Sequence, residues 1–385
     1  MIEIKDKRLC TGCGACANIC PRGCISMQED GFGFIYPRID VNTCIRCGLC
    51  NKSCPMLSKD NALDDRGERA PLFYAGQLRD QEELFSVSSG GAFWAFAQAI
   101  LKRGGIVYGA VQDDVDKISH FRADTLDAAR RLRRSKYLQS DTGLVYQQVR
   151  KDLDAGTVVL FTGTGCQIAA LYAFLRKPYD ELYTCDVVCH GVPSALVWRQ
   201  YREEKEALEK KKITGLIFRD KSLGWSQNQY CITYEDGTQE RELSVRHPFH
   251  AGYLSGLFSR PSCGTCRFAC FPRGSDITLA DYWKYEGNLR SSSNDKGVSL
   301  IVVNTTHGEV LLDYGKEFLL IETTARELAL ASSRHLTHAP RENPNRAAFF
   351  RRFHRAGYND AVNAFLHKRT FFQMIKQIIG KLLHG

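Results

Sequence analysis

Two cysteine runs near the N-terminus have the residue types and the spacing for metal-cluster chemistry. Both follow the pattern C-x2-C-x2-C-x3-C-P. Their members are Cys10, Cys13, Cys16 and Cys20 in the first run and Cys44, Cys47, Cys50 and Cys54 in the second. Such spacing folds the backbone around a cubane [4Fe-4S] cluster that takes three thiolates from one run and the fourth from the other. The sequence therefore predicts two [4Fe-4S] clusters.

A crossed pattern assigns each cluster its own thiolates, because the first three cysteines of each run join the last cysteine of the other. The two predicted sets are Cys10, Cys13 and Cys16 with Cys54, and Cys44, Cys47 and Cys50 with Cys20. A four-cysteine zinc site is the alternative, since zinc also uses paired C-x2-C spacing. A four-cysteine zinc site does not require three evenly spaced cysteines, a fourth after three further residues and then Pro. It also does not explain why this pattern occurs twice. The pattern therefore favours iron-sulfur clusters.

Further cysteines stand at predicted loop positions later in the chain. Cys166 ends a Gly-Thr-Gly-Cys turn between an apolar strand and an amphipathic helix, which is where α/β units bind ligands. Cys189 follows the next predicted strand, and Cys263, Cys266 and Cys270 lie close together in one segment. The C-x2-C pair with Cys166 and Cys189 would supply the four thiolates of a third cubane, or equally of a zinc site. Taken singly, each cysteine also suits a buried apolar position.

A Ser-Gly-rich turn marks a candidate ligand site. Ser88, Ser89, Gly90 and Gly91 stand directly before an apolar helix predicted at 92–102. Small residues at a helix N-terminus allow backbone N–H groups to approach a phosphate. The same residues also suit a plain N-cap and tight turn, so the turn alone leaves both interpretations open.

A basic stretch at 128–143 follows, in which several arginines precede Lys136 and Tyr137. One interpretation is a cationic lip for an anionic cofactor, with Lys136 and Tyr137 facing it. The other is a solvated helix face, which carries charge without a ligand.

The elements that must position these residues divide the chain into five predicted parts and give an α+β fold. Alternating aromatics at 31–40 indicate a short hairpin that covers the clusters, and strands alternate with helices beyond residue 70. The predicted parts are a dicluster ferredoxin-like domain at 1–57, a polar linker at 58–70, a mixed α/β body at 71–152 and 153–340 with the third cluster site in its second part, and a basic helical tail at 341–385.

Composition limits the classes of partner. The chain has 385 residues with ordinary hydrophobic and charged fractions, and eight of its basic residues against one acid lie after Asn345. The rest is nearly neutral, so we expect no nucleic-acid partner. The tail has helices with one apolar and one cationic face, which suit docking on the body or peripheral contact with an anionic membrane. No apolar run reaches the ~18 residues of a spanning helix. Cluster thiolates need a reducing compartment. We therefore expect a cytoplasmic protein that is at most peripheral at the inner membrane surface.

Several motifs in one order resemble a known family, the beta subunits of coenzyme F420 hydrogenase and dehydrogenase, here with a two-cluster ferredoxin domain in front. The matching segments are SVSSGG at 86–91, SKYLQS at 135–140, GTGCQIAAL at 163–171, VCHGVPS at 188–194 and the CGTCRF to SDITLADYW region at 263–283. One departure is Gly165, which stands where the family turn usually has Pro; it loosens the turn and keeps the thiolate.

The resemblance implies a flavoprotein oxidoreductase that binds FAD and one further [4Fe-4S] cluster. Its flavin would exchange hydride with a deazaflavin or another small substrate and pass single electrons to the iron-sulfur centres. Carried over by position, the flavin or substrate pocket would contain Ser88, Ser89, Gly90, Gly91, Lys136 and Tyr137. The third-cluster ligands would be Cys166, Cys189, Cys263 and Cys266, with Cys270 in reserve.

Three functions remain open at this point. The first is an enzyme that passes electrons between ferredoxin-type clusters and a flavin acting on a small substrate. The second is an electron-transfer subunit without its own substrate, serving a separate catalytic protein. The third is a non-catalytic zinc scaffold. The expected partner is a redox protein such as a ferredoxin, or the catalytic protein.

Overall fold

The computed structural model describes residues 2–57, 70–289 and 295–383, and describes 367–383 by their backbone alone. In the N-terminal domain two antiparallel strands form a hairpin, β1 (Ile25–Glu29) and β2 (Ile35–Ile39). The prediction placed this hairpin within 31–40; it begins earlier, and that segment supplies only the turn and the second strand. The helical pieces are η1 (Lys7–Leu9), α1 (Ala15–Asn18) and α2 (Leu49–Lys52).

Glycines begin both short helices of this domain. Gly14 and Gly48 precede α1 and α2 with φ angles of 76° and 75°, in the left-handed region that glycine adopts without strain. Each glycine follows the second cysteine of its run, so the chain turns sharply and brings the third cysteine back toward the first two. At Gly14 a side chain would also meet Thr142 Oγ1 at 2.3 Å.

The body is built around a nine-stranded mixed sheet with the order β14-β3-β13-β12-β8-β7-β4-β5-β6. Strands β12, β8, β7 and β4 run parallel at its centre, so the segments following β7 and β8 emerge at the same edge. The strands are β3 (Leu72–Leu78), β4 (Ile106–Asp114), β5 (Lys117–Ala123), β6 (Ser140–Asp141), β7 (Val159–Thr164), β8 (Leu182–Val187), β12 (Ile277–Asp281), β13 (Ser299–Val303) and β14 (Leu319–Thr323).

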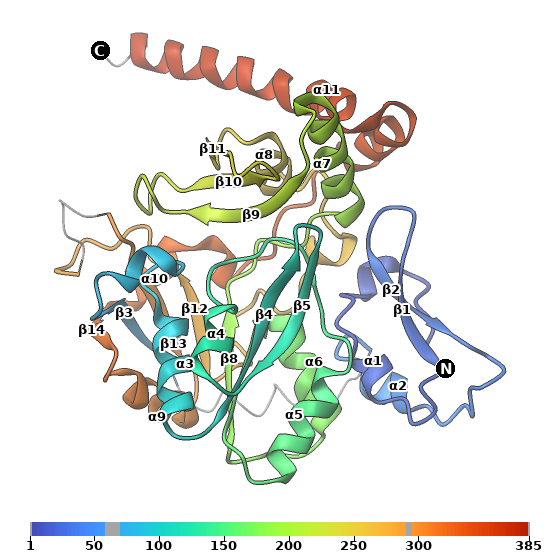
Figure 1. Cartoon of the computed structure of the whole chain (residues 1–385), viewed down its shortest axis with the longest axis vertical. Helices are drawn as coiled ribbons and strands as arrows, with labels where there is room; N and C mark the ends of the chain where they lie inside the picture. Colours follow the sequence, from blue (N-terminus) through green and yellow to red (C-terminus); the bar gives the residue numbers. More distant parts are fainter. Residues whose placement is uncertain (1, 58–69, 290–294, 384–385) are drawn as a thin grey trace.

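Helices cover both faces of this sheet (Figure 1). Neighbouring residues of β4 and β7 face opposite cores, because Val107 and Leu160 pack with α3 and α9 while Tyr108 and Phe161 pack with α5 and α6. The helices are α3 (Ala92–Lys102), α5 (Val145–Asp154), α6 (Gly165–Leu175) and α9 (Thr306–Gly315), with the shorter η3 (Glu83–Ser86), α4 (Leu126–Arg130), η4 (Pro261–Cys263), α10 (Arg326–Ser332) and η5 (Arg334–Leu336).

A second, three-stranded antiparallel sheet adjoins the first and has the order β11-β10-β9. Its core is aromatic and includes Trp198, Phe249 and Phe349. The apolar and β-branched residues of the sequence predict strands at 210–219 and 229–234, which correspond to β9 and β10, whereas β11 and α8 were not predicted. The elements are β9 (Ile213–Asp220), β10 (Gln229–Tyr234), β11 (Gln239–Leu243), α7 (Ala195–Glu209), α8 (Pro248–Leu254) and α11 (Arg346–Leu383).

The structure confirms the mixed α/β body and the C-terminal helix. Helix α11 breaks at Gly357, whose φ is 82°. The predicted linker lies outside the described residues apart from Ala70, and the domain boundaries stay predictions. Within the described ranges, no helix combines the length and apolarity needed to cross a membrane.

Candidate functional site

The N-terminal domain has two cavities, and each is lined by four cysteines of one crossed set. The first contains Cys10, Cys13, Cys16 and Cys54 among apolar neighbours. The second contains Cys20, Cys44, Cys47 and Cys50 and encloses about 350 Å³, part of it open to solvent. We call the first the proximal cavity, because it lies against the body, and the second the distal cavity. The grouping supports the predicted ligand sets.

The electrostatics of the proximal cavity suit a cluster whose iron-sulfur core is cationic. Burial raises the pKa of the Cys13 thiol to about 11, and the neighbouring Cys54 and Cys10 add to the effect. Burial and the same neighbours raise the pKa of Cys16 further. Thiols as crowded and buried as those of Cys13 and Cys16 resist ionisation until cationic iron offsets their charge, and the iron of a cubane would provide that positive charge.

Zinc and a cubane require different separations of their ligand sulfurs. Among the residues that the structure describes, no three His, Cys, Asp or Glu side chains converge closely enough to hold a single metal ion. Zinc draws its thiolates to about 2.3 Å from one centre. A cubane places an iron atom under each thiolate and therefore holds the sulfurs farther apart.

A ninth cysteine, which the prediction did not include, lines the distal cavity. Cys24 is buried at the start of β1, and its Sγ lies 3.3 Å from Cys20 Sγ. Hydrogen bonding to Cys20 and burial raise the pKa of the Cys24 thiol to about 12. The signal in the sequence was a cysteine four residues after the end of the first run.

The body brings a third group of cysteines together. Cys166 lies in the first turn of α6, Cys189 follows β8, and Cys263 and Cys266 lie at and after η4. Burial, followed by the nearby Cys263, raises the pKa of Cys189 to about 12, and burial with Cys166 and Cys266 does the same for Cys263. Cys270 is exposed and stays at the edge of the group. The four predicted ligands thus lie close enough together for their charges to interact.

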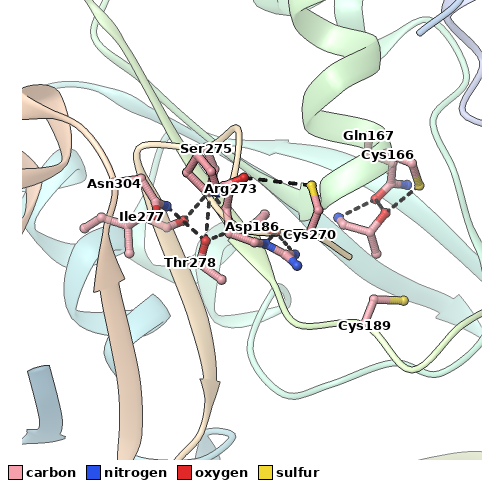
Figure 2. A network of polar contacts seen from close by, with 12 residues as sticks. Cys166, Gln167, Asp186, Cys189, Cys270, Arg273, Ser275, Ile277, Thr278 and Asn304 are labelled. Atoms are coloured by element: carbon pink, nitrogen blue, oxygen red, sulfur yellow. Dashed lines mark hydrogen bonds and ion pairs between the residues drawn. The ribbon is translucent and has the colours of Figure 1, made fainter. Parts of the chain in front are cut away.

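A buried ion pair stands beside this third group (Figure 2). The Asp186 carboxylate accepts hydrogen bonds from Ser275 Oγ and Thr278 Oγ1, both at 2.6 Å, and from the guanidinium of Arg273. Burial opposes the charge of Arg273, but Asp186 more than offsets this and raises the arginine pKa. The fixed cation favours the thiolate form of Cys189. Arg273 therefore brings positive charge toward the thiolates.

The proximal cavity is joined to the body by direct hydrogen bonds. Arg260 is 1% exposed, and its Nε donates to the Cys10 carbonyl at 2.9 Å while Nη2 donates to the Ile35 carbonyl at 2.7 Å. The Tyr146 hydroxyl donates to the Cys13 carbonyl at 2.9 Å. Burial raises the pKa of Tyr146, and the thiols of Cys13 and Cys166 add to the increase. Tyr146 is therefore close to both the proximal cavity and the third group.

Protein contacts occupy much of the predicted phosphate cradle. The Gly90 and Ala92 amides donate to Ser299 Oγ at 3.0 and 3.4 Å, and the hydroxyls of Ser88 and Ser135 bond each other at 2.9 Å. A side chain on Gly90 would meet the Gly76 carbonyl oxygen at 2.2 Å. The small residues of the turn thus serve its close packing on β3 and β13, as an N-cap and tight turn would.

Lys136 is tied to the backbone instead of extending into an open pocket. Its Nζ donates to the carbonyls of Ala110, Arg133 and Arg131 at 2.8, 2.7 and 3.3 Å. Burial, with Arg134 nearby, lowers the pKa of Lys136 to about 7. Tyr137 packs instead among aromatic side chains of the second sheet and α8.

Two basic residues that the sequence did not single out, Arg219 and Lys221, lie beside Asp281 and Trp283 of the SDITLADYW segment. Lys221 is 3% exposed, and burial together with Arg219 lowers its pKa to about 7. Arg219 forms two hydrogen bonds with Asp281, at 2.7 and 3.1 Å. Trp283 stacks on Trp225 with ring centroids 4.2 Å apart and is 41% exposed. Cations and a planar aromatic surface, features that suit an anionic cofactor with a flat ring, therefore lie together.

Comparisons with known proteins agree with the division into a cysteine-rich N-terminal domain and a mixed α/β body. Residues 9–57 match the 4Fe-4S dicluster domain, and residues 156–328 match the family described as the C terminus of the coenzyme F420 hydrogenase/dehydrogenase beta subunit. The N-terminal domain is thus a 4Fe-4S dicluster domain. The predicted resemblance to the F420 hydrogenase/dehydrogenase beta subunits, with this domain in front, is confirmed.

Relatives with similar sequences come from Methanocaldococcus jannaschii. The coenzyme F420-dependent sulfite reductase is 26% identical over 366 residues, covering 90% of this chain and 53% of the reductase. An iron-sulfur protein of the CoB–CoM heterodisulfide reductase is 40% identical over 63 residues, 13% of this chain and 9% of that protein. The chain thus spans about half the length of the coenzyme F420-dependent sulfite reductase. A chain of the F420-reducing [NiFe] hydrogenase complex from Methanosarcina barkeri aligns with a TM-score of 0.44 and 15% identity, over 78% of this chain and 92% of that chain.

Proposed function

We propose that the chain is an iron-sulfur flavoprotein oxidoreductase. Electrons would pass between the two clusters of the N-terminal domain, a third [4Fe-4S] cluster at Cys166, Cys189, Cys263 and Cys266, and FAD that reduces or oxidises a small substrate. The single observation that carries the proposal is the position of the proximal cavity beside the third cysteine group, with Tyr146 close to both. A relay requires this proximity, whereas two independent structural sites do not.

The protein's own residues would fix distances and tune charge. Arg260 and Tyr146 hold the backbone of the proximal ligands against the body, and Arg273 places a cation near Cys189. Such burial and charge are the means by which a protein sets cluster potentials. When bound, FAD would supply the exchange between an electron pair and single electrons.

The proposed FAD pocket lies between the turn at 86–91 and the second sheet. The predicted residues Ser88, Ser89, Gly90, Gly91, Lys136 and Tyr137 would line its base, although Ser88, Gly90, Lys136 and Tyr137 contact other protein groups in the structure. Arg219 and Trp283 are the stronger candidates for contact with the cofactor, since the guanidinium lies 5.6 Å from the centre of the exposed ring. Lys221 would supply positive charge behind them, because its Nζ donates to the carbonyls of Ser89 and Lys296 at 2.9 and 2.7 Å. Sulfite and coenzyme F420, which the relative's name mentions, are candidate reactants for this pocket.

Anaerobic purification tests the proposal most simply. Iron, acid-labile sulfide and flavin would be quantified together with a visible spectrum and a reductive titration. About twelve irons and one FAD per chain are expected. Zinc without a visible chromophore would overturn the proposal.

An electron-transfer subunit without its own substrate is the second candidate. The hydrogen bonds that occupy Ser88, Gly90 and Lys136 favour it, because they leave fewer groups free to hold a flavin phosphate. Iron without flavin in the same purification would support this candidate. Lys221→Ala and Trp283→Ala should lower the flavin content without changing the iron content if the flavoprotein proposal holds.

A further inference from the structure

The two cluster cavities differ in what covers them. Hydrogen bonds from Arg260, Gln139 and Tyr146 tie the proximal cavity to the body. Of the hydrogen bonds and ion pairs that join the described parts of domain and body, none involves residues 38–52, which carry three cysteines of the distal cavity. Helix α1 lies against α6, with α2 on the far side of α1 (Figure 1). The distal cavity thus lies on the side away from the body.

Two exposed apolar side chains lie at the distal cavity or in the turn that leads to it. Cys47, a predicted ligand, is exposed. Ile45 lines the cavity and is 61% exposed, and Val41 in the preceding turn is 62% exposed. Exposed branched side chains beside an exposed cluster ligand cost solvation energy in the isolated protein, and burying them favours association.

The rim of the same opening is cationic. Arg22 and Arg46 line the cavity, are exposed, and form no ion pair with any residue of the described ranges. Asp40 is the one acid between residues 38 and 57. Its carboxylate accepts hydrogen bonds from the Asn42 amide and the Thr43 hydroxyl, so it is engaged within its own turn. No acidic side chain of this segment therefore offsets the positive charge at the rim.

We propose that this surface, formed by Arg22, Val41, Ile45, Arg46 and Cys47 and called the entry face below, docks an acidic one-electron carrier protein. The inference rests on the proposed function, because it requires a cluster in the distal cavity. In the exchange one electron moves between the carrier's redox centre and the distal cluster; one partner is oxidised and the other reduced by one unit, and no covalent bond or proton is transferred.

Charge and size both match a carrier of this kind. A cationic rim attracts a negatively charged protein and raises its association rate by about 10- to 1000-fold at low salt. Weak electron-transfer complexes bury less than about 1,200 Å², so a small apolar centre is sufficient and allows rapid release. Electrons that enter here would reach the proximal cluster next and then the third cysteine group.

Charge reversal at the rim tests the proposal. The protein, purified anaerobically, would be mixed with a photoreduced acidic [2Fe-2S] ferredoxin in a stopped-flow instrument at several salt concentrations. Arg22→Glu/Arg46→Glu should lower the second-order rate of cluster reduction at least tenfold at low salt and remove most of its salt dependence. Lys117→Glu/Arg246→Glu, which reverses two exposed charges of the body, should change neither. The final extent of reduction by excess dithionite should be the same in all samples.

Iron content distinguishes a failure of the proposed function from a failure of the entry face alone. Wild-type protein without cluster iron overturns the proposed function and the entry face with it. Full iron content with ferredoxin rates that do not respond to the Arg22 and Arg46 changes overturns the entry face alone. If the double Glu variant loses iron, Arg22→Gln/Arg46→Gln replaces it with the same expected direction, and Ile45→Ser tests the apolar centre independently.

Discussion

Arg260 connects the N-terminal domain to the body through a single buried side chain. Its guanidinium donates to two carbonyls of the N-terminal domain and to Gln139 Oε1 at 3.1 Å, and it lies 4.5 Å from the centre of the Tyr36 ring. The Cys10 sulfur is 3.8 Å from Nη2. A cation this close to a cluster ligand stabilises the reduced cluster, whose charge is more negative. Arg260 therefore favours electrons on the proximal cluster.

Replacing Arg260 should change one cluster potential selectively. Arg260→Gln is expected to lower the midpoint potential of the proximal cluster by roughly 59 mV or more, the equivalent of a tenfold change in a one-electron equilibrium. The distal cluster should change little. EPR-monitored redox titration measures both.

Arg267→Gln is the matched control for Arg260, because Arg267 also crosses the junction, donating to the Pro55 carbonyl at 3.3 Å, but is exposed. Water screens its charge, so its removal should leave both potentials nearly unchanged. Equal shifts in the two variants would contradict the assignment to Arg260. Losing a buried donor also leaves carbonyls unpaired at a cost of about 1–3 kcal/mol each, so the thermal midpoint should fall in Arg260→Gln alone.

At the scale of elements, the start of α8 places two buried histidines in the aromatic core of the second sheet, His247 as the N-cap and His250 within the helix. His247 is 2% and His250 5% exposed, and burial lowers the pKa of each to about 3. His247 Nε2 lies 2.9 Å from the Tyr201 hydroxyl, and Arg219 faces His250. The unfolded chain takes up protons near pH 6.5 whereas the folded chain does not, so stability is complete above about pH 6.5 and falls as the pH drops toward 3.

This pair predicts a pH-dependent stability of the body. Each histidine should remove about 1.4 kcal/mol of unfolding free energy per pH unit below 6.5. His247→Gln/His250→Gln is expected to be less stable at pH 7.5 but to lose less between pH 7.5 and 5.5 than wild type. Urea unfolding followed by tryptophan fluorescence measures the difference, with His338→Gln as an exposed control. Parallel pH dependence in wild type and the double variant would refute this account.

The first part of helix α11 packs on the body. Up to Val362 its apolar side chains, among them Phe349, Phe353 and Tyr358, are buried in the core of the second sheet. The Glu204 carboxylate accepts from the amides of Tyr358 and Asn359 just after the break at Gly357. The first part is therefore docked on the body, the first of the two predicted roles for the tail.

The predicted membrane contact is thus limited to the segment beyond Leu366. Removing residues 367–385 should leave iron content and thermal midpoint unchanged, while binding to vesicles rich in anionic lipid should be lost. Removing everything after Asn345 should instead unfold the second sheet. Vesicle sedimentation by the shortened chain at the wild-type level would exclude a membrane role for this segment.

Considered as a whole molecule, the chain places its three cysteine groups in order from an exposed face to the body. The distal cavity faces solvent, the proximal cavity lies against the body, and the third cysteine group follows. This order depends on how the N-terminal domain docks, which Arg260 and Tyr146 determine from positions far apart in the sequence.

The parts that sequence could predict are those with local patterns. Helix α3 and strand β10 were predicted to the residue, and the cysteine runs gave both four-cysteine cavities, because spacing and periodicity are properties of a short segment. The Asp186–Arg273 pair, the junction at Arg260 and the partners of Gly90 join segments distant in sequence, so no local pattern indicated them.

The most direct measurement of the central claim is the iron content of a third-site variant. Wild-type protein purified without oxygen should contain about twelve irons per chain, and Cys263→Ser/Cys266→Ser about eight, with the dicluster EPR signals retained. Cys231→Ser, which changes a buried cysteine outside all three groups, should keep about twelve. About eight irons in all three proteins would contradict the claim that this chain holds a third cluster in addition to the two of its N-terminal domain.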